Sequence, residues 1–107
     1  MVLAVCIVLS VVGTFLIAAI VYLKTLSVTV VFWDVGEFIA SAVLLQVPHP
    51  PGSPLFILLG RLCSQIPYFT DIAARVHAIS AMGSALTIMF LYLVSVKVIT
   101  RVRGPIR

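Results

Sequence analysis

Two long apolar runs dominate the chain, and a mixed segment separates them. The first run extends from Val2 to Leu23 and contains no charged residue and no proline. The second run, from Ala78 to Val96, is also uncharged and is followed at once by Lys97. Because about 20 consecutive apolar residues are enough for a helix to cross a bilayer, the pattern predicts two transmembrane helices, at about residues 2–23 and 72–97.

The segment between the runs, residues 24–75, predicts two short helices on either side of a rigid turn. Residues 35–47 are rich in Ala and Leu and are expected to be helical. The stretch PHPPGSP at residues 48–54 then holds four prolines, each of which fixes φ and removes a backbone donor. Gly52 permits a bend inside this stretch. No helix or central strand is therefore expected to run through it.

A second short helix is predicted at about residues 54–66, because proline suits the first position of a helix. Four leucines in it fall at the i, i+3, i+4, i+7 spacing of one helix face: Leu55, Leu58, Leu59 and Leu62. Arg61, Ser64 and Gln65 are expected to form a polar strip. This amphipathic pattern predicts a helix that lies in the membrane interface.

Composition supports the same fold class. Of the 107 residues, 63% are hydrophobic and only 9% are charged, whereas about a quarter of the residues of a soluble domain are charged. We therefore predict an all-α integral membrane protein in which two transmembrane helices are joined by an outer loop with two short interfacial amphipathic helices. We expect a single membrane segment without a second domain. A cleaved signal peptide is disfavoured, because no basic residue precedes Lys24.

The cations predict an orientation in the membrane. Four of them follow the second apolar run: Lys97, Arg101, Arg103 and Arg107. By the positive-inside rule, residues 98–107 form a basic cytoplasmic tail, both termini are cytoplasmic and residues 24–75 lie outside. In a bacterial inner membrane this outer side is periplasmic. The net charge of +4 comes largely from the tail, which favours contact with anionic lipid over nucleic-acid binding.

Small residues recur along both predicted spans and indicate helix packing. Their side chains let helices approach closely in lipid, either between the two spans or against other transmembrane subunits of a larger complex. Cys6 and Cys63 are expected at opposite sides of the membrane, where they cannot pair. The expected packing positions are Ser10, Gly13, Thr14 and Ala18 in the first span and Ser80, Ala81, Gly83, Ser84 and Ala85 in the second.

The hexapeptide WDVGEF, residues 33–38, concentrates two of the three acidic residues of the chain, Asp34 and Glu37. One interpretation is a capping box, in which Asp34 is the N-cap of the first short helix and Glu37 its N3 residue. The other is catalytic, because a carboxylate held at a helix start beside the membrane is well placed to act as a general base. The spacing is compatible with both interpretations.

These residues resemble a bacterial family of large polytopic membrane proteins that are related to protein O-mannosyltransferases and have the GT-C glycosyltransferase fold. The family pattern WDxGEF followed by HPPGxPLFxLLGR is present here at residues 33–38 and 49–61. The resemblance implies sugar transfer from a lipid-phosphate donor on the outer membrane face. It also implies that Asp34 acts as base or binds the acceptor or a metal, with Glu37 as a second candidate.

Weaker roles follow for three other residues. By the same resemblance, His49 and Arg61 are candidates for contact with the sugar-phosphate. Alternatively, His49 is a turn residue that hydrogen-bonds nearby backbone, and Arg61 is an interfacial cation that extends its charge to the headgroups. His77 is interpreted as a polar residue at a helix end.

No motif for a metal or a cofactor is recognisable, so we expect neither, although lipids or pigments could contact the surface.

Two readings of function remain from the sequence. In the first, the chain is the N-terminal segment of a lipid-phosphate-sugar-dependent glycosyltransferase and is not catalytic alone, because two helices cannot enclose a lipid-linked donor. In the second, it is a shortened, non-catalytic accessory subunit of a large membrane complex. A respiratory complex or the photosynthetic reaction centre of green sulfur bacteria would be such a host. Its partners would then be membrane lipids and other transmembrane subunits.

Overall fold

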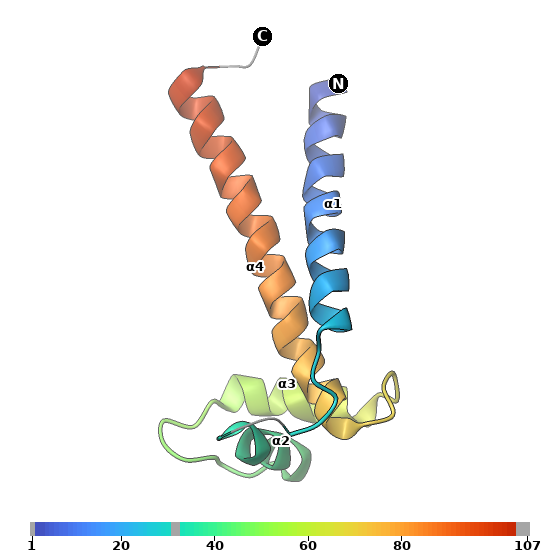
Figure 1. The fold of residues 1–107 in the computed structure, drawn as a ribbon. Helices are drawn as coiled ribbons and strands as arrows, with labels where there is room; N and C mark the ends of the chain where they lie inside the picture. Colours follow the sequence, from blue (N-terminus) through green and yellow to red (C-terminus); the bar gives the residue numbers. More distant parts are fainter. Residues whose placement is uncertain (1, 31–32, 105–107) are drawn as a thin grey trace. The chain divides into compact units, whose positions relative to one another are not determined.

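The computed structural model describes residues 2–30 and 33–104. Its helices are α1 (Val2–Lys24), α2 (Val35–Leu44), α3 (Pro54–Gln65) and α4 (Ile72–Arg103), shown in Figure 1. The described residues contain no strand, so the all-α prediction is confirmed for them. The chain divides into two compact units, one made of Met1–Lys24 with Met82–Arg107 and the other of Thr25–Ala81.

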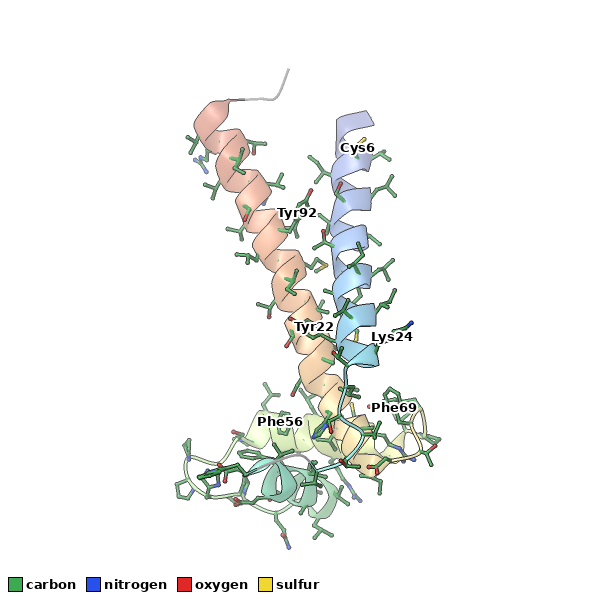
Figure 2. The ribbon with its side chains drawn as sticks, viewed as in Figure 1. Cys6, Tyr22, Lys24, Phe56, Phe69 and Tyr92 are labelled. Carbon is green, nitrogen blue, oxygen red and sulfur yellow. The ribbon has the colours of Figure 1, made fainter. Side chains whose placement is uncertain are left out.

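Two helices have the length and composition of membrane spans, as the apolar runs predicted. They are Val5–Lys24 and Ile72–Val102, and their most apolar windows are only 6% and 11% buried. A core helix of a soluble protein would be largely covered, so the exposure of these windows favours spans. Lys24, at the end of α1, extends away from the helix (Figure 2).

The second span is longer than the sequence pattern indicated. It was expected to end near residue 97, whereas α4 continues to Arg103 and includes most of the predicted basic tail. The reason is local, because residues 98–103 contain neither glycine nor proline. Gly104, with φ of +76°, follows the last helical residue, as is common at helix C-termini.

In the unit that contains α1, a small cluster of alanines is buried. Ala18 and Ala19 of α1 and Ala85 of α4 form it, with Phe15 and Ile88 packed against it. Of the predicted packing positions, Ala18 and Ala85 therefore lie in a contact. Gly13 and Gly83 were also predicted packing positions. A Cβ atom added at either of them would have no neighbouring atom within 4 Å.

Two of the polar packing positions, Ser10 and Thr14, are satisfied within their own helix. The hydroxyl of Ser10 donates to the carbonyl of Cys6, and that of Thr14 donates to the carbonyl of Ser10, both over 2.8 Å. Ser80 is exposed and Ser84 half-buried, whereas Ala81 is buried in the other unit. Cys6, near the start of α1, and Cys63 are both free (Figure 2).

The unit formed by residues 25–81 has its own core, built from α2, α3 and the start of α4. Its buried members are Ile39, Ala42, Ile57, Ala73 and Val76. The helices α2 and α3 approach closely at Gly60, where an added Cβ atom would lie 2.6 Å from the Cβ of Ala42. Only a residue without a side chain permits this contact, so Gly60 sets the spacing of the two helices.

The faces of α3 are arranged differently from the predicted polar strip. Ile57, Gly60 and Ser64 are buried, so Ser64 does not belong to a solvent-facing strip. Its hydroxyl donates to the carbonyl of Arg61 over 2.7 Å. The four leucines of the predicted stripe are all exposed, by 41% to 71%. The apolar stripe is therefore an outer surface of this unit.

The helix α2 ends at Leu44, three residues before its predicted end. Leu45 adopts the left-handed conformation, with φ of 54°, and its N–H donates to the carbonyl of Ser41. The N–H of Gln46 donates to the same carbonyl over 2.9 Å. The proline turn follows, with Gly52 at φ of +88° and a cis bond between residues 50 and 51. The predicted bend at Gly52 is thus confirmed.

Side-chain hydrogen bonds stabilise the connection between α3 and α4. Asp71 accepts a 2.7 Å hydrogen bond from the N–H of Ala73 and so caps α4. Arg75 donates to the carbonyls of Ser64, Phe69 and Thr70 over 2.6 to 3.4 Å. Tyr68 donates to the carbonyl of Arg75 over 2.7 Å, and burial raises the pKa of Tyr68 to about 12.

Candidate functional site

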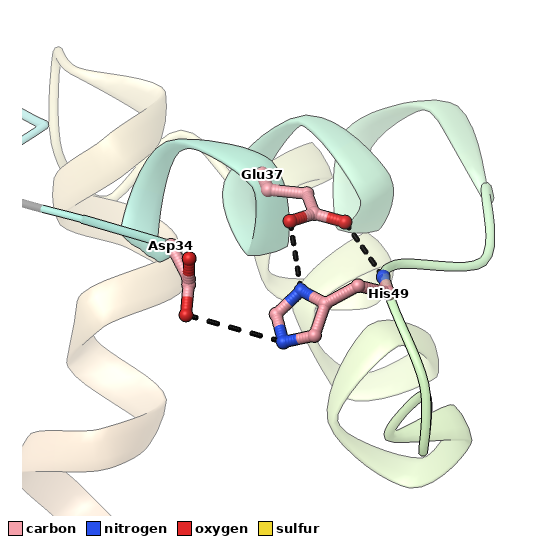
Figure 3. Close-up of polar contacts among 3 residues, drawn as sticks. All are labelled: Asp34, Glu37 and His49. Atoms are coloured by element: carbon pink, nitrogen blue, oxygen red, sulfur yellow. Dashed lines mark hydrogen bonds and ion pairs between the residues drawn. The ribbon is translucent and has the colours of Figure 1, made fainter.

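Three ionisable side chains meet where the start of α2 faces the proline turn. Asp34 and Glu37 come from the beginning of α2, and His49 comes from the turn (Figure 3). The Oε2 atom of Glu37 lies 2.9 Å from Nδ1 of His49, and its Oε1 accepts a 2.6 Å hydrogen bond from the backbone N–H of His49. The Oδ2 atom of Asp34 lies 3.9 Å from Nε2 of the same ring. We call these three residues the acidic–histidine cluster.

The capping-box prediction is wrong for these side chains. Asp34 does occupy the N-cap position, and its carbonyl accepts the first helical hydrogen bond from Phe38 over 3.0 Å. Its carboxylate, however, makes no capping hydrogen bond. The Glu37 carboxylate turns to His49, because the ring and the backbone of that one residue together supply two donors. Sequence spacing within the hexapeptide could not reveal a partner 12 residues away.

The contact shifts the titration of both partners. The hydrogen bond from the His49 ring lowers the pKa of Glu37, with the backbone hydrogen bond as the second cause. The same ring contact with Glu37 raises the pKa of His49, and the charge of Asp34 adds to it as the weakest cause. The three side chains remain between 43% and 49% exposed, so solvent screens these interactions.

The paired form should therefore exist over a defined pH window. The raised pKa of His49 means that its contribution to stability is lost as pH rises through that pKa. The lowered pKa of Glu37 means that its contribution is lost as pH falls through that pKa. Between these limits both groups are charged. Above the pKa of Glu37 and below that of His49, these two residues are thus held as an ion pair.

Replacing Glu37 by Gln should return the pKa of His49 toward its ordinary value. The hydrogen bond and the charge of Glu37 are the two largest causes of the shift, and the amide supplies no charge. Asp34→Asn should lower the same pKa by less, because the Asp34 charge is the weakest cause. An NMR titration of the His49 ring in the purified chain measures both values. An unchanged midpoint in Glu37→Gln would contradict the contact.

One aromatic ring packs against the ring of His49 and joins it to α3. The ring of Phe38 meets His49 edge-on, with ring centroids 5.8 Å apart. Phe38 also packs edge-on against Phe56 of α3, at 5.9 Å. Because such edge contacts are favourable and directional, they fix the His49 ring between the core of this unit and the two carboxylates.

A cleft of about 560 Å³ opens beside the cluster and lies within residues 25–81. Asp34 is the member of the cluster that lines it. The cleft walls are mainly apolar and aromatic, as is usual for ligand sites. The other lining residues are Trp33, Val35, Phe38, Ile39, Ser53, Phe56, Val76, His77 and Ser80.

His77 was interpreted from the sequence only as a polar residue at a helix end, but the structure gives it specific contacts. Its Nδ1 atom lies 2.9 Å from the carbonyl oxygen of Ser27. Its Nε2 atom is buried and has no hydrogen-bond partner among residues 2–30 and 33–104. His77 also lines the cleft. No periodicity or spacing in the sequence signals this, because Ser27 lies 50 residues away.

Arg61 has a structural contact at the other end of α2. Its guanidinium donates to the carbonyl of Val43, which belongs to the last turn of that helix. Carbonyls in a last turn lack helical partners, and Arg61 satisfies this one. Asp34 and Glu37 lie at the first turn, so the contact that Arg61 makes is separate from the acidic–histidine cluster. Its contact with a substrate stays a prediction.

The cluster has the donor types of a metal site. One oxygen each from Asp34 and Glu37 and one nitrogen from His49 lie within 4.8 Å of one another. We expected no metal site from the sequence, because these residues do not form a recognisable ligand motif. The donor set suits zinc-like ions, but Glu37 already satisfies both the ring and the backbone of His49.

Comparison with known proteins gives a consistent match. A family model described as "Protein O-mannosyl-transferase TMEM260 N-terminal domain" matches residues 34–105. Protein O-mannosyl-transferase TMEM260 of Mus musculus is 36% identical over 81 residues, covering 76% of this chain and 12% of the mouse protein. The tmem260 protein of Dictyostelium discoideum is 38% identical over 81 residues, covering 74% of this chain and 10% of that protein. No solved structure matches.

The length and the source of these relatives limit which of their properties can be assigned to this chain. The chain spans about a tenth of the length of these two relatives. Both relatives are eukaryotic, so the bacterial origin expected from the sequence stays a prediction. The accessory-subunit alternative receives no support from the comparisons. The matched range begins at Asp34 and includes the cluster and most of the cleft.

Proposed function

Because the chain belongs to the family of the protein O-mannosyl-transferase TMEM260 N-terminal domain, we propose that it forms the acceptor-activating part of a membrane mannosyltransferase. In the complete enzyme, residues 24–75 lie outside the membrane and present Asp34 to an acceptor hydroxyl. Mannose comes from a lipid-phosphate donor. The 107-residue chain alone does not catalyse transfer, because an open cleft of about 560 Å³ does not enclose such a donor.

The placement of Asp34 is the observation that carries this proposal. Its carboxylate makes no capping hydrogen bond, and it lines the cleft. Glu37, in contrast, accepts two hydrogen bonds from His49. A carboxylate held at a fixed helix start but not used for capping is suited to accept a proton from a substrate. Asp34 is therefore the base, and Glu37 positions His49 beside it.

The reaction balances with Asp34 as the proton acceptor. The acceptor oxygen forms a bond to the anomeric carbon of mannose while the bond from that carbon to the lipid phosphate breaks. The hydroxyl proton passes to the Asp34 carboxylate, and the lipid phosphate leaves with the electron pair. The neighbouring His49, at 3.9 Å from Asp34, provides positive charge while Asp34 is ionised.

The membrane arrangement follows from the exposed surfaces. The leucine stripe of α3 is uncovered and faces the lipid interface in this proposal. The cations at the end of α4 lie on the cytoplasmic side, which places residues 24–75 on the opposite, outer side. In the bacterial inner membrane expected from the sequence, that side is periplasmic. Membrane lipids and further helices of the complete enzyme are the partners of α1 and α4.

An exchange of segments tests the proposal. The 81-residue segment of the mouse relative that aligns with this chain is replaced by the corresponding residues of this chain. We expect the exchanged protein to transfer mannose from a lipid-phosphate donor to a hydroxyl acceptor in isolated membranes. The unmodified mouse protein is the control. Loss of transfer in an exchanged protein that inserts and accumulates normally would overturn the proposal.

A further inference from the structure

The hydrogen bond to Ser27 determines which nitrogen of His77 carries the proton. A carbonyl oxygen can only accept, so Nδ1, at 2.9 Å, must carry the hydrogen and donate it. In the neutral ring, Nε2 is then an acceptor with an available lone pair. This atom is buried and has no partner among the described residues. Because buried polar atoms are nearly always hydrogen-bonded, the unpartnered Nε2 calls for a donor from outside the described residues.

The residues around His77 indicate which kind of ligand could supply that hydrogen-bond donor. His77 lines the same cleft as Asp34, so a histidine ring and a carboxylate belong to its walls. Arg61 and Arg75, the arginines of this unit, donate to backbone carbonyls elsewhere, and neither they nor His49, which is paired with Glu37, line the cleft. A phosphate or another anion is therefore disfavoured at this position. A neutral ligand with hydroxyl groups fits it.

The cleft also favours a sugar ring over a single hydroxyl. Trp33, Phe38 and Phe56 line it, and aromatic faces suit the apolar C–H surface of a pyranose. A serine or threonine side chain has one hydroxyl proton, and in the proposed function Asp34 takes that proton. A second hydroxyl is then needed for His77, and a sugar ring bound beside the acceptor has several.

We propose that Nε2 of His77 accepts a hydrogen bond from a ring hydroxyl of a neutral pyranose bound in the cleft. The inference deepens the proposed function and rests on it for the choice of sugar. His77 is then a binding residue of the donor sugar, whereas Asp34 acts on the acceptor. The cleft volume of about 560 Å³ lies within the range of small-ligand sites.

Sugar binding to the chain itself tests the inference without any transfer reaction. The 107-residue chain, labelled with ¹⁵N-histidine and held in lipid nanodiscs, is titrated with methyl α-D-mannopyranoside up to about 100 mM. Long-range ¹H–¹⁵N spectra report the two ring nitrogens separately. We expect Nδ1 to be protonated before titration, and Nε2 of His77 to shift in a saturable manner as the sugar binds.

A pair of variants makes the test specific. His77→Phe keeps a ring of similar shape without an acceptor and should weaken mannoside binding about 3- to 10-fold. Thr87→Val is the matched control on the same helix, because the Thr87 hydroxyl donates to its own helix at Gly83. It should leave the affinity unchanged. Binding by these variants is followed by saturation-transfer signals of the mannoside.

Three outcomes would overturn the inference. The first is no shift of His77 Nε2 in the unmodified chain, which needs no variant to fold. The second is a saturable shift with inorganic phosphate, which would mean an anion site. The third is a shift with N-acetylthreonine methylamide but not with the mannoside, which would assign His77 to the acceptor. Loss of transfer on segment exchange would leave sugar binding by the chain intact, so the two proposals fail separately.

Discussion

Asp34→Asn should reduce mannose transfer by the complete enzyme by about 10²- to 10⁴-fold, the usual contribution of a general base. Asparagine has nearly the same shape but cannot accept the hydroxyl proton. It caps a helix about as well as aspartate, and Asp34 makes no capping hydrogen bond in any case. The loss should therefore appear in kcat with little change in stability. Initial rates with saturating lipid-phosphate mannose measure it.

The matched comparison is Glu37→Gln in the same enzyme. Glu37 does not line the cleft and is bound to His49, so its replacement should reduce transfer by less than that of Asp34. The two variants separate proton acceptance from the positioning of the turn. If Asp34→Asn retained transfer within about threefold of the unmodified enzyme, Asp34 would not be the base.

Gly60→Ala should destabilise the unit of residues 25–81 by about 1 to 3 kcal/mol, the usual cost of overpacking a core. The added Cβ would stand 2.6 Å from the Cβ of Ala42, which is fully buried. Neither atom belongs to a flexible side chain, so the two helices must separate. This cost opposes the gain of about 0.5 to 1 kcal/mol that alanine brings to a helix interior. Amide hydrogen exchange in α2 and α3 measures the difference.

Two further variants identify the cause of this effect. Adding Ala42→Gly to Gly60→Ala removes the atom that the new methyl group meets, so much of the lost protection should return. Gly83→Ala is the control for helix propensity, because its Cβ would meet nothing within 4 Å. It should leave stability unchanged or slightly raise it. Equal protection in Gly60→Ala and in the unmodified chain would contradict the close packing of α2 and α3.

The main elements were predictable because they depend on local chemistry. An uncharged run that ends at Lys24 specifies a span, and Pro54 specifies the first position of α3. Element ends were less predictable where one residue decides them. Leu45 adopts a left-handed conformation that its side chain does not favour, and this ended α2 before residue 47.

The candidate site was predictable only in part, because its geometry depends on contacts between distant residues. The hexapeptide identified Asp34 and Glu37 as unusual, and the family resemblance added His49. The pairing of Glu37 with His49 crosses 12 residues, and that of His77 with Ser27 crosses 50. Neither contact leaves a periodic signal. A helix-end histidine can serve either as a surface group or as a wall of a cleft, and only the fold distinguishes them.

The double contact between Glu37 and the proline turn implies a rule of spacing. One carboxylate binds both the ring and the backbone of His49, and prolines on either side restrict that residue's conformations. The number of residues between Glu37 and His49 must therefore match the length of α2 and the left-handed turn at Leu45 that follows it. A related chain with the same residue types but one more residue in this interval would bring a different backbone N–H to the carboxylate. The number of residues between Glu37 and His49 thus indicates as strongly as the residue types whether a related loop can form this contact.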